Sequence, residues 1–224
     1  MVKVSPVDSG RETGAVAEHI ARAAARLFAA RGYDATPVRA IVEAAGVTKP
    51  TLYYHFGSKE GLAQALLTRP LTRLLAGHRA ILDGPADPAQ KLADMMEAEF
   101  AFVREDPDRA RFVYALFFGP LGSSLSAELA QFGGSLKDLL AEAVQAAAAA
   151  GVVDPDRAFA FHLALKGVGT VHTMGFLYGG CELDPALAHQ LVADLLRGFG
   201  RHERLEVPVQ PHSKKLRART RTRT

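Results

Sequence analysis

Lys49, Thr51, Tyr53 and Tyr54 lie close together in one short segment, and all four carry side-chain hydrogen-bonding groups. Lysine and threonine can reach the acceptor atoms on base edges in the major groove of DNA. Tyrosine hydroxyls suit phosphate oxygens. A solvated helical surface is the alternative, but two adjacent tyrosines are hard to explain in that way. These residue types at this spacing therefore predict contacts to double-stranded DNA.

Two short helices joined by a tight turn are needed to position these side chains. Pro37 suits the first position of a helix, and Thr36 before it is a good N-cap. Gly46 ends this helix, because glycine tolerates the left-handed conformation that is common at helix C-termini. Thr48 can cap the second helix, and Pro50 falls in its first turn, where no backbone donor is required. This is the layout of a helix-turn-helix whose second helix enters the major groove.

A longer pattern surrounds the helix-turn-helix. It runs from Ile20 through residues 27–29 and 32–36 to residues 52–56 and Lys59. In this pattern the chain closely resembles the TetR family of bacterial transcription regulators, and the match covers about the first quarter of the chain.

The resemblance implies a set of DNA contacts in this head. Lys49 and Thr51 would contact base edges, and most of the other residues would contact phosphates. The predicted DNA-binding residues are Thr36, Thr48, Lys49, Thr51, Tyr53, Tyr54, His55 and Lys59.

The length and composition of the chain fit a soluble helical protein. Its 224 residues suit one compact domain with a small head, and a hydrophobic content of 48% supports a core. Cys181 is the only cysteine, so no internal disulfide can form, which fits a reducing cytoplasm. The N-terminus lacks the apolar core of a signal peptide, and the longest uncharged apolar run, residues 144–153, is too short to span a membrane. We therefore expect a cytoplasmic protein without a membrane partner.

The basic residues are unevenly distributed along the chain. The formal net charge is +3, but six lysines and arginines and no acidic residue lie in residues 213–224. Without that tail the chain is net negative. Affinity for nucleic acid must therefore come from the local placement of charge.

Helix-breaking residues divide the chain into an all-α protein of about nine helices, and no segment favours a strand. We predict a flexible N-terminus at residues 1–13, a three-helix DNA-binding head with the helix-turn-helix at 14–60, a larger helical ligand-binding and dimerisation domain at 61–205, and a basic disordered tail at 206–224. Pro70 lies inside the fourth helix, which links head and body, and should bend that helix.

The larger domain is rich in aromatic residues and methionine, with a few histidines and a lysine among them. Such side chains more often form plain core than a pocket, yet proteins that the head resembles usually hold an apolar cavity among the corresponding helices. The predicted ligand-binding residues are His78, Met96, Phe100, Phe117, His162, Lys166, His172 and Phe176. We expect a small apolar or amphipathic effector that one of the polar groups orients.

No pattern of a catalytic or metal site emerges from the chain. His162 and His172 are ten residues apart on one predicted helix, which places them on different faces, and no cysteine or carboxylate cluster joins them. No nucleophile with a nearby base and no pair of carboxylates is apparent. Gly167 and Gly169 are not preceded by a strand, so they do not indicate a phosphate-binding loop. We expect no enzymatic activity, no metal and no cofactor.

The last two helices are apolar on more than one face, which indicates burial on several sides. Core packing could explain this pattern, but in TetR-like proteins the corresponding pair forms a four-helix dimer interface. The predicted interface residues are Phe159, Leu163, Leu187, Leu191 and Leu195.

These patterns and the resemblance predict a sequence-specific, homodimeric transcription regulator. We expect a repressor that an apolar small molecule releases from a palindromic operator. The alternative is a DNA-organising or co-regulatory protein of the same fold without a small-molecule effector, which a tightly packed core without a cavity would favour.

Overall fold

The computed structural model describes residues 9–119 and 124–199, and this part of the chain is entirely helical. The helices are α1 (Ser9–Arg31), α2 (Val38–Ala44), α3 (Lys49–Phe56), α4 (Lys59–Asp83), α5 (Pro88–Glu105), α6 (Pro107–Phe118), α7 (Ser124–Ala149), α8 (Ala158–Gly179) and α9 (Pro185–Phe199), with one turn of 3-10 helix at Pro155–Arg157. The predicted all-α fold is confirmed. The predicted basic tail at 206–224 lies outside the described residues.

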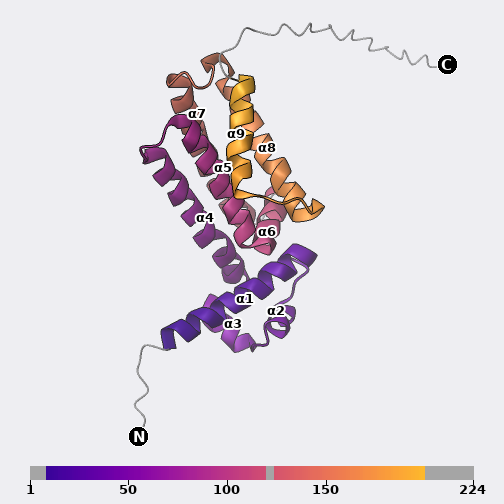
Figure 1. The fold of residues 1–224 in the computed structure, drawn as a ribbon. Helices are drawn as coiled ribbons and strands as arrows, with labels where there is room; N and C mark the ends of the chain where they lie inside the picture. Colours follow the sequence, from indigo (N-terminus) through magenta and orange to yellow (C-terminus); the bar gives the residue numbers. More distant parts are fainter. Residues whose placement is uncertain (1–8, 120–123, 200–224) are drawn as a thin grey trace, which may run out of the picture.

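The helices form a small head and a larger body (Figure 1). Helices α1, α2 and α3 make the head, which lies below the body in this view. Helix α4 begins beside α3 and continues along the body, where it packs against α5 and α7. Helices α5 to α9 complete the body, and α9 packs along α5. Head and body are joined covalently by α4, and α6 makes a second contact by packing against α1.

Side-chain caps start α3, where the sequence predicted one, and also α4. Thr48 Oγ1 accepts a hydrogen bond from the Thr51 N–H at 3.3 Å, and Ser58 Oγ accepts one from the Gly61 N–H at 2.9 Å. Each bond satisfies a backbone donor that has no intrahelical partner in the first turn. Gly46 follows α2 with a φ of +60°, in the left-handed conformation that was expected there.

Thr36 does not cap α2, so that prediction was wrong. Its side chain is fully buried, and its hydroxyl donates to the Gly32 carbonyl at 2.7 Å and lies 3.3 Å from the Leu27 carbonyl. Pro37 occupies the N-cap position, and no side chain caps this helix. A buried hydroxyl needs a hydrogen-bond partner, and the backbone carbonyls of Gly32 and Leu27 at the end of α1 provide it. Thr36 therefore fastens the start of α2 to α1.

Two further predictions concern the ends and the shape of helices. The sequence suggested a flexible N-terminus at residues 1–13. Helix α1 begins at Ser9, however, so residues 9–13 are helical. Helix α4 continues without interruption through Pro70. The bend that we expected at this proline stays a prediction.

An aromatic cluster joins the head to the body. The Phe112 ring of α6 lies 5.0 Å from the Phe28 ring of α1 and 6.5 Å from the Tyr33 ring, centroid to centroid. Phe28 and Phe112 are buried, and aromatic pairs at these distances contribute about 0.5–1.5 kcal/mol each beyond the area that they bury. Lys59 places its ammonium 4.2 Å from the centre of the Tyr33 ring, so the first turn of α4 belongs to the same cluster.

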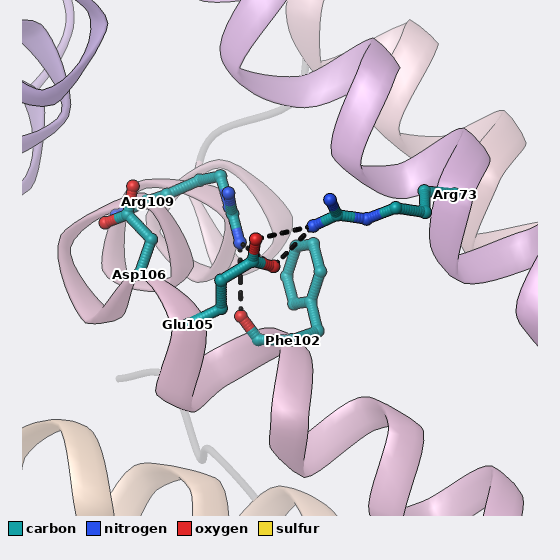
Figure 2. A network of polar contacts seen from close by, with 5 residues as sticks. All are labelled: Arg73, Phe102, Glu105, Asp106 and Arg109. Carbon is teal, nitrogen blue, oxygen red and sulfur yellow. Dashed lines mark hydrogen bonds and ion pairs between the residues drawn. The ribbon is translucent and has the colours of Figure 1, made fainter. Parts of the chain in front are cut away.

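A polar network lies at the junction of α4, α5 and α6 (Figure 2). Arg73 of α4 donates to Glu105 Oε1 at 2.7 Å, and Arg109 of α6 donates to Glu105 Oε2 at 3.2 Å. Arg109 also donates to the Phe102 carbonyl at 3.3 Å, and its guanidinium lies 4.8 Å from the centre of the Phe102 ring. Asp106 caps α6 by accepting the Arg109 N–H at 2.9 Å. The Glu105 carboxylate, at the end of α5, thus holds cations from two other helices.

The charge of Glu105 stabilises this junction. Burial would raise the pKa of its carboxyl, but the hydrogen bond from Arg73 and the charges of Arg109 and Arg73 outweigh burial and lower the pKa below its usual value. A lowered pKa in the folded protein means that the carboxylate contributes stability above the unfolded-state pKa. That contribution is lost as the pH falls through the folded-state pKa. The Arg109 side chain is buried, so it depends on this carboxylate.

Replacing Glu105 with Gln should lower the free energy of unfolding by about 1–2 kcal/mol at neutral pH, because the buried Arg109 guanidinium loses its counter-charge. The loss should shrink at acidic pH, where Glu105 of the wild type is itself protonated. Urea unfolding followed by circular dichroism at several pH values measures both effects. The matched control is Glu142→Gln, which breaks an exposed ion pair with Arg79 and should cost less. Equal losses for the two variants would contradict this account of the junction.

Candidate DNA-binding surface and ligand cavity

Helix α3 presents polar and aromatic side chains on its outer side. Leu52 is fully buried and fixes the inner side of the helix against the head core. Tyr54 is 79% exposed and Tyr53 is 46% exposed, and Lys49 is exposed at the first helical position. None of these three outer side chains has an ion pair within the described part of the chain. They are therefore free to contact another molecule.

The other predicted DNA contacts of the head already contact side chains within the chain. The hydroxyls of Thr48 and Thr51 lie 2.8 Å apart and hydrogen-bond each other. His55 is half-buried, and its ring centre lies 5.1 Å from that of Tyr54. Lys59 is half-buried, with its ammonium over the Tyr33 ring. As DNA contacts, these four residues remain predictions.

Thr36 must be removed from the predicted DNA contacts. Its side chain has no exposed surface, and its hydroxyl is committed to carbonyls at the end of α1. The sequence suggested a cap because threonine before proline is a common helix start. The fold uses the same hydroxyl inside the head instead.

The body contains a cavity of about 520 Å³ among α4, α5, α6, α7 and α8. This volume is within the ~300–1,000 Å³ that is usual for small-molecule sites. The wall includes the apolar side chains Leu71, Leu74, Phe102, Val103, Val113, Phe117, Phe118, Leu129, Ala130, Phe132, Leu136 and Leu163. Gly133 of α7 leaves room in the wall for Phe117, because a Cβ atom there would lie 3.3 Å from the Phe117 ring.

The polar wall of the cavity contains a half-buried ion pair. Lys166 Nζ of α8 donates to both carboxylate oxygens of Glu99 of α5, at 3.0 and 2.9 Å. Burial would raise the pKa of Glu99, but the charge of Lys166 and the neighbouring His78 outweigh it and lower the pKa to about 2. Burial would likewise lower the pKa of Lys166, yet the Glu99 carboxylate keeps it above its usual value. Both groups are therefore charged at neutral pH.

Further polar groups line the same cavity. Tyr114, Lys137, His162 and Thr170 contribute to the wall. Burial of the Tyr114 hydroxyl raises its pKa. Burial, together with the positive charges of Lys166 and Lys137, lowers the pKa of His162. His162 is thus neutral at neutral pH and can donate one hydrogen bond and accept another.

Three of the eight predicted ligand residues line the cavity: Phe117, His162 and Lys166. The other five lie elsewhere. Met96 and Phe100 are buried in the core, and Phe176 is half-buried and packs against that core. His172 is half-buried, with Nδ1 at 2.9 Å from the Val168 carbonyl of its own helix.

His78 lies behind the cavity wall rather than in it. Its side chain is only 1% exposed, and its Nδ1 lies 3.0 Å from the Leu74 carbonyl. Its Nε2 faces Glu99 Oε1 at 3.7 Å and has no hydrogen-bond partner among the described residues. The prediction of His78 as a direct ligand contact was therefore wrong, because the ring is buried and does not line the cavity.

Several cavity residues were not predicted from the sequence, above all Glu99, Tyr114 and Lys137. One signal for Glu99 was available. It follows Leu92 and Met96 at helical spacing on the buried face of α5, and an acidic residue on such a face needs a buried partner. No comparable signal marks Lys137, which is exposed to solvent as well as to the cavity.

An apolar strip runs along the outside of α8. Phe159, Leu163, Val171 and Tyr178 are exposed on it. Lys166, the only Lys, Arg, Asp or Glu of this helix, points to Glu99 instead. The predicted interface residues Leu187, Leu191 and Leu195 of α9 are half-buried and pack against the core of their own chain. Their role in a dimer remains a prediction.

Residues 20–66 match the family model of bacterial regulatory proteins of the tetR family. The matched range contains α2, α3 and the exposed side chains described above. The head is a TetR-family DNA-binding domain. The resemblance inferred from the sequence is confirmed.

Relatives of known activity share the TetR-family head. The transcriptional activator FasR of Mycolicibacterium smegmatis is 39% identical over 92 residues, which cover 41% of this chain and 42% of FasR. The transcriptional repressor KstR2 of Mycobacterium tuberculosis is 43% identical over 77 residues, which cover 34% of this chain and 38% of KstR2. The matches thus span less than half the length of either relative.

Solved structures extend the likeness to the body. The ketosteroid transcriptional regulator KstR2 of Mycobacterium tuberculosis aligns over 85% of this chain and 96% of its own, with a TM-score of 0.69 and 24% identity. The regulator FadR of Bacillus subtilis, solved in complex with stearoyl-CoA, aligns over 81% of this chain and 98% of its own, with a TM-score of 0.65 and 19% identity. These identities show the fold alone. The described part of the chain has the fold of TetR-family regulators.

The surface of α3 leads to a prediction about DNA recognition. Lys49→Ala should weaken binding to the specific DNA site by about 1–3 kcal/mol and relax the base preference, because a lysine on a base edge carries sequence information. Tyr54→Phe should weaken binding to specific and to scrambled DNA equally, and by less than Lys49→Ala weakens specific binding. A contact to phosphate carries no sequence information. Fluorescence anisotropy with specific and scrambled duplexes at two salt concentrations separates the two effects. Full-strength, selective binding by Lys49→Ala would remove α3 from the reading role.

Proposed function

We propose that the chain is a homodimeric transcriptional repressor that leaves its DNA operator when a small molecule fills the cavity. The observation that carries the DNA-binding part is the free surface of α3, with Tyr54 79% exposed, inside the range that matches the TetR-family head. Two adjacent exposed tyrosines and an unpaired lysine suit a groove lined by phosphates and base edges. The protein would then act on cytoplasmic DNA, with no catalytic turnover.

The cavity supports the ligand-responsive part of the proposal. Its volume of about 520 Å³ and its mainly apolar wall suit a small amphipathic molecule. The alternative, a regulator of the same fold without an effector, would be supported by a tightly packed body. The open cavity argues against that alternative.

Two helices connect the cavity with the head. Leu71 and Leu74 of α4 line the cavity, and the same helix begins in the head. Val113 and Tyr114 of α6 also line it, and the preceding Phe112 packs against Phe28 of the head. A ligand that moves either helix would tilt the head relative to the body. The coupling of ligand and DNA binding would then be antagonistic.

The apolar strip of α8 supports a homodimer. An uncharged strip along one helix of a monomer exposes apolar surface that a second copy can cover. Two heads held in this way would place their α3 helices in successive major grooves, about 34–36 Å apart, and the operator would be palindromic. KstR2, whose fold this chain has, is described as a transcriptional repressor, whereas FasR is an activator.

Selection of bound duplexes from a random DNA pool tests the proposed function directly. The expected product is an inverted repeat with half-sites one helical turn apart. Transcription in vitro from a promoter that overlaps the repeat should fall when the protein is added. No enrichment of any sequence would contradict a sequence-specific regulator, and increased transcription would replace the repressor with an activator.

The dimer prediction uses α8 because the leucines of α9 also support the core of their own chain. Phe159→Glu combined with Val171→Glu should weaken the dimer by about 3 kcal/mol, roughly a hundredfold, because carboxylates in an apolar seam lose their hydration. Light scattering over a range of concentrations measures the change. Ala76→Glu, at an exposed position of α4, is the control and should stay dimeric. A dimer of unchanged strength in the double variant would place the interface elsewhere.

A further inference from the structure

The polar side chains of the cavity carry one uncompensated positive charge. Lys166 and Lys137 are cations, whereas Glu99 is the only acidic residue in the wall. Lys166 is already paired with Glu99. Lys137 has no ion pair within the described part of the chain, and His162 beside these lysines is neutral.

We propose that the cavity binds a molecule with a carboxylate at one end of an apolar body, and that this carboxylate takes the place of Glu99 on Lys166 and also pairs with Lys137. The proposal rests on the proposed function only in treating this cavity as the effector site. Lys166 already bonds two carboxylate oxygens, at 2.9 and 3.0 Å, so the geometry for such a group is built. The Lys166 side chain is still 41% exposed, so its ammonium is accessible from the cavity.

Charge balance favours an anion over other head groups. A neutral ligand would leave the Lys137 ammonium without an anionic partner in the cavity wall. A cationic ligand would add a second charge of the same sign. A carboxylate neutralises the cavity, and its charge-assisted hydrogen bonds to lysine are among the strong ones. His162 can donate a further hydrogen bond to the same group.

His78 of α4 lies beside the Glu99 carboxylate that the ligand would displace. The Leu74 carbonyl can only accept, so His78 Nδ1 carries a hydrogen. His78 Nε2 has no partner and lies 3.7 Å from Glu99 Oε1. The Glu99 carboxylate that Lys166 releases would still face this ring nitrogen of His78. Because His78 lies in α4, binding of the ligand carboxylate would act on the helix that begins in the DNA-binding head.

Displacement of a fluorescent apolar dye from the full chain, without DNA, tests the head group. Hexadecanoate and deoxycholate supply a carboxylate on a flexible and on a rigid body, and their methyl esters supply the same bodies without charge. At least one carboxylate should bind about tenfold or more tightly than its ester. Equal affinity of acid and ester, or binding by neither acid, would overturn the proposal. Tighter binding of hexadecanoyl-CoA than of hexadecanoate would also overturn it, since phosphates of the carrier would then be the anion recognised.

Variants assign the contact to named residues. Lys166→Met should reduce carboxylate affinity about tenfold and leave the ester unchanged, whereas Glu99→Gln should tighten carboxylate binding because the competing anion is gone. If Lys166→Met does not fold, Lys137→Gln at the exposed position gives the same direction of change. Arg197→Gln removes one exposed charge from α9 and should have no effect. Unchanged carboxylate affinity in both Lys137→Gln and Glu99→Gln would overturn the assignment.

His78→Gln tests the route to α4. This variant should reduce the factor by which the carboxylate lowers operator affinity. An unchanged factor would exclude His78 from the route. If the carboxylates bind no better than their methyl esters, neutral compounds could still displace the protein from DNA. The ligand-responsive part of the proposed function would fail if no compound, whatever its polar group, changed operator affinity.

Discussion

The packing of Phe112 against Phe28 and Tyr33 is the contact on which the rest of the structure depends. Phe112 belongs to α6, and its neighbours Val113 and Tyr114 in the same helix line the cavity. Close-packed interiors transmit displacement rather than absorb it. A shift of α6 at the cavity therefore cannot occur without a shift of Phe112 against the head. Helix α4 makes the second connection, because it is continuous from the head to the cavity wall.

Two carboxylates of α5 organise the polar interior of the body around that contact. Glu105 pairs with Arg73 of α4 and Arg109 of α6 at the junction of these helices, and Glu99 pairs with Lys166 of α8 in the cavity wall. The pKa of each carboxyl is lowered by its cationic partners despite burial. Helix α5 is thus joined by ion pairs to α4, α6 and α8. A ligand that replaces one partner of such an ion pair would change how α5 is joined to a neighbouring helix. The apolar core would stay intact.

The head could be predicted from the sequence because its signals are local. Thr48 and Gly46 mark helix ends through capping and left-handed backbone geometry, and the exposed side chains of α3 follow from periodicity. Thr36 was misread because its hydroxyl bonds to α1, a tertiary choice that no local rule contains. The cavity was predicted only in part. Periodicity identifies inward residues such as Met96 and Phe100, but whether a residue fills space or borders a gap depends on neighbours from four other helices.

The central claim is that occupancy of the cavity and binding of the operator oppose each other through α4 and α6. The most direct test is the affinity for the selected operator, measured by fluorescence anisotropy with and without a ligand that saturates the cavity, together with the ligand affinity with and without the operator. The account predicts that the ligand weakens operator binding by about 5–150-fold and that the operator weakens ligand binding by the same factor. Operator affinity that is independent of a filled cavity would contradict the account.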